Sequence, residues 1–229
     1  FFEIGPVFLP APGQSLPAEP QHLALALTGL RLESSWDRPV KDTFDFYDLK
    51  GLLEEAMAGL HLENISVAPA EHPSFHPGKC ATLLVDGRTA GIFGELHPLV
   101  KERFDFGPAP VLAAELDLNL VLPLVQQRYH VSPVASFPPV LEDIAVIVDE
   151  DLPAGRVEEV IRQAGGKMLA GLRLFDVFRG PQIGEGKKSL AYGLTYQSAE
   201  RTLTDSDALQ IRQRIIRRLE QDLGAKLRS

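Results

Sequence analysis

The chain has 229 residues, of which 45% are hydrophobic and 24% are charged, with a formal net charge of −8. It can therefore bury the core of one large or two small domains, and its composition is not that of a disordered chain. No apolar run approaches the ~18–20 residues of a membrane-spanning helix, and no secretory leader is recognisable, so we expect no membrane association. The single Cys80 excludes an intramolecular disulfide and fits a cytoplasmic protein. Because the sequence starts at Phe1 without an initiator Met, we expect a fragment of a longer protein.

The negative charge lies entirely in the first part of the chain. Residues 1–136 carry 9 basic and 17 acidic side chains, whereas residues 137–229 carry 14 of each. The total argues against nonspecific binding of nucleic acid, but a neutral domain with grouped Lys and Arg can still contact phosphates locally.

The first part mixes strand and helix signals. The apolar run 23–29 predicts a buried strand, and 111–117 predicts another. Residues 81–96 predict a hairpin around the Asp86-Gly87 turn. A helix is expected from Asp48 to Gly59. Its expected apolar face consists of Leu49, Leu52, Leu53 and Ala56.

Two groups in this part have the residue types of a chemical site. His72, His76 and Cys80 come close to metal-ligand spacing, but prolines interrupt them and a further ligand is missing, so a turn before a strand is favoured. Glu95 and His97 form a candidate acid–base pair, which capping side chains at a strand end explain equally well. We predict no catalytic residue and no metal site.

Three prolines within seven residues mark a boundary between residues 129 and 139. Beyond it, strands are predicted at 143–148, 169–178, 189–196 and 225–228. One helix is predicted from Pro153 to Gly165-Gly166 and a longer one from a Thr204 cap, with Asp207 as its capping-box partner, to Gly224. The expected buried residues of the first helix and second strand are Val157, Val160, Ile161, Ala164, Leu172, Leu174, Phe175 and Val177. This order is the ferredoxin-like βαββαβ arrangement.

The end of the second strand in this part is a candidate RNA contact. Asp176, Phe178 and Arg179 come close in sequence to Lys187, Lys188 and Ser189 across one loop. An aromatic ring on a sheet can stack an unpaired base, a carboxylate can accept from a base edge, and cations attract phosphates. Simple alternation of solvent-facing residues along a strand explains the same pattern. The long helix carries further arginines, for which a solvated face or pairing with Glu220 or Asp222 is the default: Arg212, Arg214, Arg217 and Arg218.

Ordered motifs in both parts resemble the bacterial phenylalanyl-tRNA synthetase beta subunit family. In the first part they are residues 2–8, 48–51, 76–78 and 91–98, and in the second they are residues 137–140, 143–145, 174–180, 186–191 and 201–205. The resemblance implies an α+β chain. Residues 1–130 would be a partial class II synthetase-like antiparallel α/β domain without catalysis, 131–136 a linker, and 137–229 a ferredoxin-fold anticodon-binding domain.

The resemblance also implies partners and residue roles. The chain would bind the anticodon end of tRNA(Phe) and dock with a catalytic alpha subunit, in an enzyme of two alpha and two beta chains. That enzyme would use ATP and Mg²⁺, with no cofactor in this fragment. Phe178 would stack on an anticodon base beside Asp176 and Ser189, while Arg179, Lys187 and Lys188 would attract phosphates.

Two positions depart from the family pattern. Phe178 stands where Tyr is usual, which keeps the ring but removes a hydroxyl, and Leu141-Glu142 replace basic residues before Asp143. Two alternatives remain beside the resemblance. One is a ferredoxin-like ligand-binding regulatory module without RNA binding, and the other is a free-standing enzyme that uses Glu95 and His97.

Overall fold

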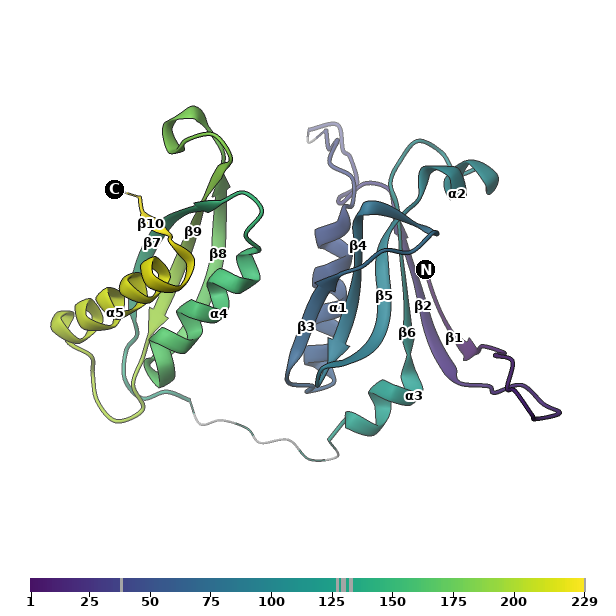
Figure 1. Ribbon diagram of the computed structural model, residues 1–229, viewed down its shortest axis with the longest axis horizontal. Coiled ribbons are helices and arrows are strands. Elements are labelled where there is room, and N and C mark those ends of the chain that lie inside the picture. The colour runs from purple at the N-terminus through teal and green to yellow at the C-terminus, as the bar shows by residue number, and fades with distance from the viewer. Residues whose placement is uncertain (38, 127, 129–130, 132–133, 229) are drawn as a thin grey trace. The chain divides into compact units, whose positions relative to one another are not determined.

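The computed structural model describes residues 1–37, 39–126, 128, 131 and 134–228 (Figure 1). The chain forms two compact units, Phe1–His130 and Val131–Ser229, each with its own hydrophobic core. Of the expected linker 131–136, residues 132 and 133 lie outside the described residues, as do Tyr129 and His130 before it. The described residues from Val134 to Pro139 form neither helix nor strand.

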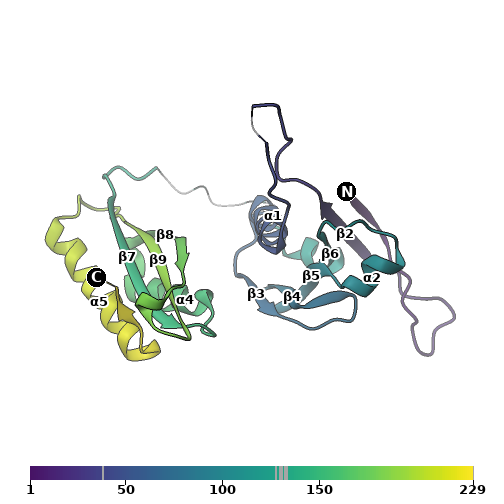
Figure 2. The same cartoon turned by 90° about the horizontal axis from the view of Figure 1, so that it is seen from above.

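The first unit is built on one six-stranded antiparallel sheet. Its strands lie in the order β1-β2-β6-β5-β4-β3, most of which Figure 2 shows across the sheet. The bounds are β1 Phe2–Pro6, β2 Gln21–Thr28, β3 Ile65–Pro69, β4 Phe75–Val85, β5 Arg88–Leu96 and β6 Val111–Asp117. The predicted hairpin is confirmed, because β4 and β5 are joined at Asp86 and Gly87, which have φ angles of 48° and 73°. Two consecutive positive φ values are what a two-residue hairpin turn needs.

Helix α1, Phe46–Gly59, packs on this sheet against β5 and β6. The predicted helix is confirmed, but its details differ. Asp45 is the N-cap, and Asp48 closes the capping box from the third helical position. Leu52 and Ala56 are exposed, whereas Met57 is buried. The side of the helix that faces the sheet therefore follows the i, i+4, i+8 spacing from Leu49 rather than the predicted apolar face. The buried residues of α1 are Leu49, Leu53 and Met57. The unit also contains two short helices, α2 Pro98–Arg103 and α3 Leu118–Val121, and a 3₁₀ turn, Leu122–Leu124.

The second unit has a four-stranded antiparallel sheet in the order β10-β7-β9-β8. The strands are β7 Val140–Asp149, β8 Leu169–Phe178, β9 Lys187–Tyr196 and β10 Lys226–Leu227, and the helices are α4 Ala154–Gly165 and α5 Asp205–Leu223, with 3₁₀ turns at Gly166–Met168 and Pro181–Ile183. The order along the chain is βαββαβ, so the ferredoxin-like prediction is confirmed.

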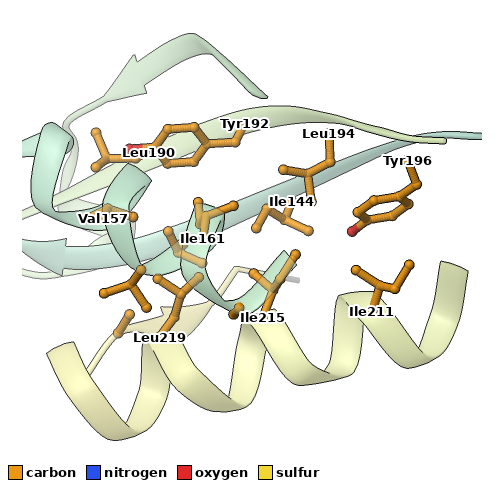
Figure 3. Close-up of a cluster of buried hydrophobic side chains, with 14 of the residues drawn as sticks. Ile144, Val157, Ile161, Leu190, Tyr192, Leu194, Tyr196, Ile211, Ile215 and Leu219 are labelled. Atoms are coloured by element: carbon orange, nitrogen blue, oxygen red, sulfur yellow. The ribbon is translucent and has the colours of Figure 1, made fainter. Parts of the chain in front are cut away.

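Helices α4 and α5 cover one face of this second sheet (Figures 1 and 3). The Thr204–Asp207 capping box begins α5, and Gly224 ends it at a φ of 62°, both as predicted. Figure 3 shows the side chains of α4, α5 and the sheet meeting in one apolar layer. Fully buried members of this layer include Val157, Ile161, Tyr192, Tyr196 and Ile215.

Candidate nucleic-acid interface

Among the described residues of the second unit, no helix covers the other face of the sheet, and Asp176, Phe178 and Ser189 lie on that face. Cross-strand partners in an antiparallel pair share a face. Ile144 pairs with Tyr192 on the helix-covered face, so the intervening pairs point the opposite way. Phe178 lies directly opposite Ser189, and Asp176 lies directly opposite Ala191. The structure therefore brings Asp176, Phe178 and Ser189 together at one end of the uncovered face, which we call the open face.

Strand β8 does not keep a simple alternation as it enters this region. Its register with β9 shifts between Leu174 and Asp176, which makes Phe175 the extra residue of a β-bulge. The prediction that Phe175 and Val177 are buried is wrong, since they are 48% and 41% exposed. The bulge turns Phe175 to the open face, near Gly193, and Val177 lies at the end of an edge strand.

Phe178 and Ser189 are both covered in this structure. The Phe178 ring is half-buried, and the guanidinium carbon of Arg228 lies 4.6 Å from its centroid. Ser189 is only 2% exposed, whereas Asp176 is exposed. Arg228 was absent from the sequence prediction. A final strand at 225–228 was predicted, but the residue pattern does not give the register that carries this side chain over the ring.

The three predicted phosphate-contacting cations lie beside Asp149, the last residue of β7, and Glu150, which follows it. Arg179 donates two hydrogen bonds from Nε and Nη2 to Oε1 of Glu150, at 3.0 and 2.7 Å. Lys188 donates to the Glu150 carbonyl at 2.7 Å, and Lys187 pairs with Asp149. The hydrogen bond from Arg179 lowers the pKa of Glu150. These cations lie at the rim of the open face, and the neighbouring carboxylates of Asp149 and Glu150 partly neutralise their positive charge.

The arginines of α5 contact the protein itself. Arg214 donates from Nε to the Ala164 carbonyl at 2.5 Å and from Nη2 to the Gly165 carbonyl at 3.1 Å, which satisfies the end of α4. Arg218 pairs with Asp222, as predicted, at 2.7 Å. Arg212 lies 3.9 Å from Glu142. Arg217 and Glu220 form no ion pair with each other among the described residues.

The candidate groups of the first unit are used in local structure. Nδ1 of His72 and of His76 each accept a backbone N–H two residues on, from Ser74 and Gly78, and Cys80 is buried, which raises the pKa of its thiol. In the described part of the chain, no three His, Cys, Asp or Glu side chains gather as metal ligands would.

Glu95 and His97 likewise have separate structural partners. Glu95 accepts a hydrogen bond from Lys79 at 2.5 Å, and His97 caps α2 by accepting the Leu99 N–H at 3.2 Å. These contacts match the alternative of capping side chains at a strand end.

Comparison with known families identifies both units. Residues 135–228 match the family described as ferredoxin-fold anticodon binding domain, and residues 1–118 match the phenylalanyl tRNA synthetase beta chain CLM domain. Together with the sheet order, the first match defines the second unit as a ferredoxin-fold domain of the anticodon-binding class. The chain belongs to the phenylalanyl-tRNA synthetase beta chain family.

Curated relatives agree along the whole chain. Proteins named phenylalanine–tRNA ligase beta subunit are 42% identical in Symbiobacterium thermophilum, covering 100% of this chain and 25% of that protein. The relative in Bacillus cereus is 38% identical, and the match covers 99% of this chain and 28% of that protein. The relative in Moorella thermoacetica is 42% identical, and the match covers 99% of this chain and 28% of that protein. The chain thus spans about a quarter of the length of these relatives. Among the described residues, no helix is both long and apolar enough to cross a bilayer.

Proposed function

We propose that this chain is the tRNA-binding, non-catalytic C-terminal part of a phenylalanine–tRNA ligase beta subunit, and that its second unit contacts the anticodon of tRNA(Phe). The observation that carries the proposal is the placement of Phe178 opposite Ser189 on the open face, with Asp176 two residues earlier on β8. A ring in this position can stack one unpaired base, which contributes about 1–3 kcal/mol. The Asp176 carboxylate can accept hydrogen bonds from the edge of that base, and the Ser189 hydroxyl can donate or accept one.

The cations at the rim would bind the backbone of the same RNA segment. Arg179, Lys187 and Lys188 lie on the strand end and loop beside the stacking ring, within pairing distance of Asp149 and Glu150. Exposed ion pairs contribute little net free energy, about 0–1 kcal/mol. RNA phosphates can therefore replace the carboxylates as partners with little loss of free energy, and binding releases counterions from the RNA.

The remaining assignments follow from the family. We propose that residues 1–130 form a non-catalytic class II synthetase-like domain that docks with the alpha subunit, and that residues 131–136 link it to the anticodon-binding domain at 137–229. Two alpha and two beta chains would form the cytoplasmic enzyme, which attaches phenylalanine to tRNA(Phe). ATP and Mg²⁺ would bind in the alpha subunit.

Filter binding of the chain to tRNA(Phe) tests the stacking role. Phe178→Ala is expected to weaken binding about 5- to 150-fold, the equivalent of one stacked base. Phe178→Tyr keeps the ring and should retain binding. Phe104→Ala is the matched control, because it removes an exposed ring from the first unit. With one stacked base and a few phosphate contacts, we expect the wild-type chain to bind more weakly than nanomolar.

Two outcomes would contradict the proposal. If Phe178→Ala and Phe104→Ala bind alike, Phe178 does not stack on the RNA. If the chain binds no tRNA but titration with phenylalanine releases heat in a calorimeter, the second unit is a ligand-binding regulatory module.

A further inference from the structure

The loop between β2 and α1 carries Trp36, whose side chain is almost fully exposed. Trp36 is 98% exposed and is the single tryptophan of the chain. Figures 1 and 2 show this loop standing out beyond the start of α1. Its described residues are 29–37 and 39–45, which we call the Trp36 loop. Leu32 in the loop and Tyr47 in α1 are exposed as well. Exposed apolar side chains that gather in this way mark interaction sites on soluble proteins.

Hydrogen bonds fix the base of the Trp36 loop to α1. Leu30 forms a β-bridge with Thr43 across the loop. The Arg31 guanidinium donates from Nε to Asp48 at 2.8 Å and from Nη2 to Asp45 at 2.7 Å. The same two carboxylates form the capping box of α1. The loop is therefore held against the first turn of the helix, and a preorganised loop loses less conformational entropy on binding than a free one.

The charge of the first unit favours a protein over RNA as the occupant of this surface. Residues 1–136 carry 17 acidic and 9 basic side chains. An acidic unit repels a phosphate backbone, so an RNA base is a poor partner for this ring. Tryptophan is enriched among the few side chains that carry most of the affinity of protein–protein interfaces, where it fills a desolvated pocket. The ring thus fits an apolar pocket on a protein whose surface is basic around that pocket.

We propose that Trp36 is the anchor by which the first unit docks with the alpha subunit, its ring inserting into an apolar pocket of that subunit. The inference rests on the proposed function, in which residues 1–130 dock with the alpha subunit, and it names the contact. Arg31 is a positioning residue, because it holds the loop that presents the ring. The Trp36 loop belongs to the first unit and the proposed RNA contacts to the second, so mutations should separate docking from RNA binding.

Fluorine NMR of the whole chain, labelled with 5-fluorotryptophan, tests the docking directly. With one tryptophan, the labelled chain gives one resonance, and the unlabelled alpha subunit gives none. Addition of the alpha subunit should shift this resonance and protect it from broadening by a soluble gadolinium chelate, because a pocket shields the ring. Addition of tRNA(Phe) alone should leave both the resonance and its broadening unchanged.

Sedimentation of the chain with the alpha subunit measures what the ring contributes to affinity. Trp36→Ala should raise the dissociation constant about 30-fold or more, as the loss of a buried anchor does. The variant should fold normally, because the ring is exposed in the free chain. Phe104→Ala is the matched control, because Phe104 is a 70% exposed ring of the same unit outside the loop. It should change the dissociation constant by less than about twofold.

Arg31→Gln tests the positioning role. Alone it should weaken the association about two- to tenfold, because the loop must then be ordered on binding. In the Trp36→Ala background it should have no further effect, because Arg31 acts through the ring. An equal loss in both backgrounds would show that Arg31 contributes by itself, and the positioning role would be refuted.

The outcomes separate this inference from the proposed function. If the wild-type chain does not associate with the alpha subunit, the docking part of the proposed function fails, and the anchor fails with it. If the chain associates but Trp36→Ala binds like Phe104→Ala and the resonance stays unprotected, docking stands and the anchor is refuted. Protection of the resonance by tRNA(Phe) alone would make Trp36 an RNA contact and would also refute the anchor.

Discussion

The two faces of the β7–β10 sheet are made from alternate residues of the same strands, and they differ in every respect that matters for function. On β9 the face under the helices carries Leu190, Tyr192, Leu194 and Tyr196, all buried. The open face of the same strand carries Ser189, Ala191, Gly193 and Thr195. Because side chains alternate along a strand, adjacent positions of β9 face opposite sides, so the residues that stabilise the core are not the ones proposed to contact RNA.

A domain built in this way can carry the proposed RNA-binding surface without weakening its core. The covered face is filled by large side chains from five elements, and the Tyr192 hydroxyl at its margin is satisfied by the Ala154 carbonyl at 3.3 Å. Burial raises the pKa of both Tyr192 and Tyr196, which keeps these residues neutral. The open face of β9 carries small residues in its middle, and the side chains at the end of this face are the ones proposed to contact RNA. Substitutions should therefore divide by face into losses of stability and losses of binding.

The largest expected effect comes from the covered face. Ile215→Ala empties a site that is 0% exposed between α5 and the sheet, and should lower the free energy of unfolding by about 2–5 kcal/mol. Urea unfolding of the whole chain, with amide exchange of β9 as the local probe, measures the loss. Leu209→Ala on the exposed side of α5 is the control and should change stability by less than about 0.5 kcal/mol. Equal effects of the two substitutions would contradict the division between faces.

Local rules were sufficient to predict most of the covered face. The Thr204 cap and the Gly224 end of α5 are both encoded within a few residues of where they act, and both are predicted from the sequence. The exact pattern of β8 was not, because a bulge at Phe175 depends on pairing with β9. The α1 cap was misplaced by three residues because Asp45 and Asp48 both fit the N-terminal signal.

The open face needed long-range information. The residue pattern makes Asp176, Phe178 and Ser189 candidates for an RNA contact, and the roles that the resemblance implies for them remain predictions. The pairing of Arg179 with Glu150, 29 residues away, is a tertiary contact that no local pattern contains. Arg228 lies over Phe178 only because a two-residue strand pairs with β7 in one register. Sequence periodicity predicts faces, whereas it does not predict which distant side chains meet on them.

A smaller effect is expected when acid weakens the cap of the covering helix. Asp207 forms hydrogen bonds of 2.7–3.3 Å with the Arg201 guanidinium and with Thr204 at the start of α5. These bonds, and the one from Arg201 most of all, lower the pKa of the Asp207 carboxyl below its ordinary value of 3.8. A carboxylate with a lowered folded-state pKa stabilises the protein above about pH 4, and the contribution is lost as the pH falls through the folded-state value. Asp207→Asn should thus destabilise at pH 7, and its difference from wild type should shrink below pH 4.

Thermal unfolding of both proteins between pH 7 and pH 2 measures this difference. Asp205→Asn is the control, since Asp205 lies in the same first turn without the bidentate Arg201 contact. A pH-independent difference for Asp207→Asn would show that the cap acts through hydrogen-bond geometry alone.

The smallest effect is expected at the rim of the open face. Glu150→Gln removes the carboxylate charge beside Arg179 and leaves the backbone carbonyl that binds Lys188. Stability should not change measurably, because the pair is exposed. The affinity for tRNA(Phe) should rise about two- to threefold at low salt and return to the wild-type value near 1 M salt, where screening is nearly complete.

Glu159→Gln is the matched control, because it removes an exposed carboxylate paired with Arg156 on α4, on the covered side. An equal rise in both variants would indicate a general effect of net charge. A lower affinity of Glu150→Gln for tRNA(Phe) would mean that Glu150 holds the Arg179 guanidinium in the orientation that RNA binding requires. Glu150 would then belong to the binding surface together with Arg179.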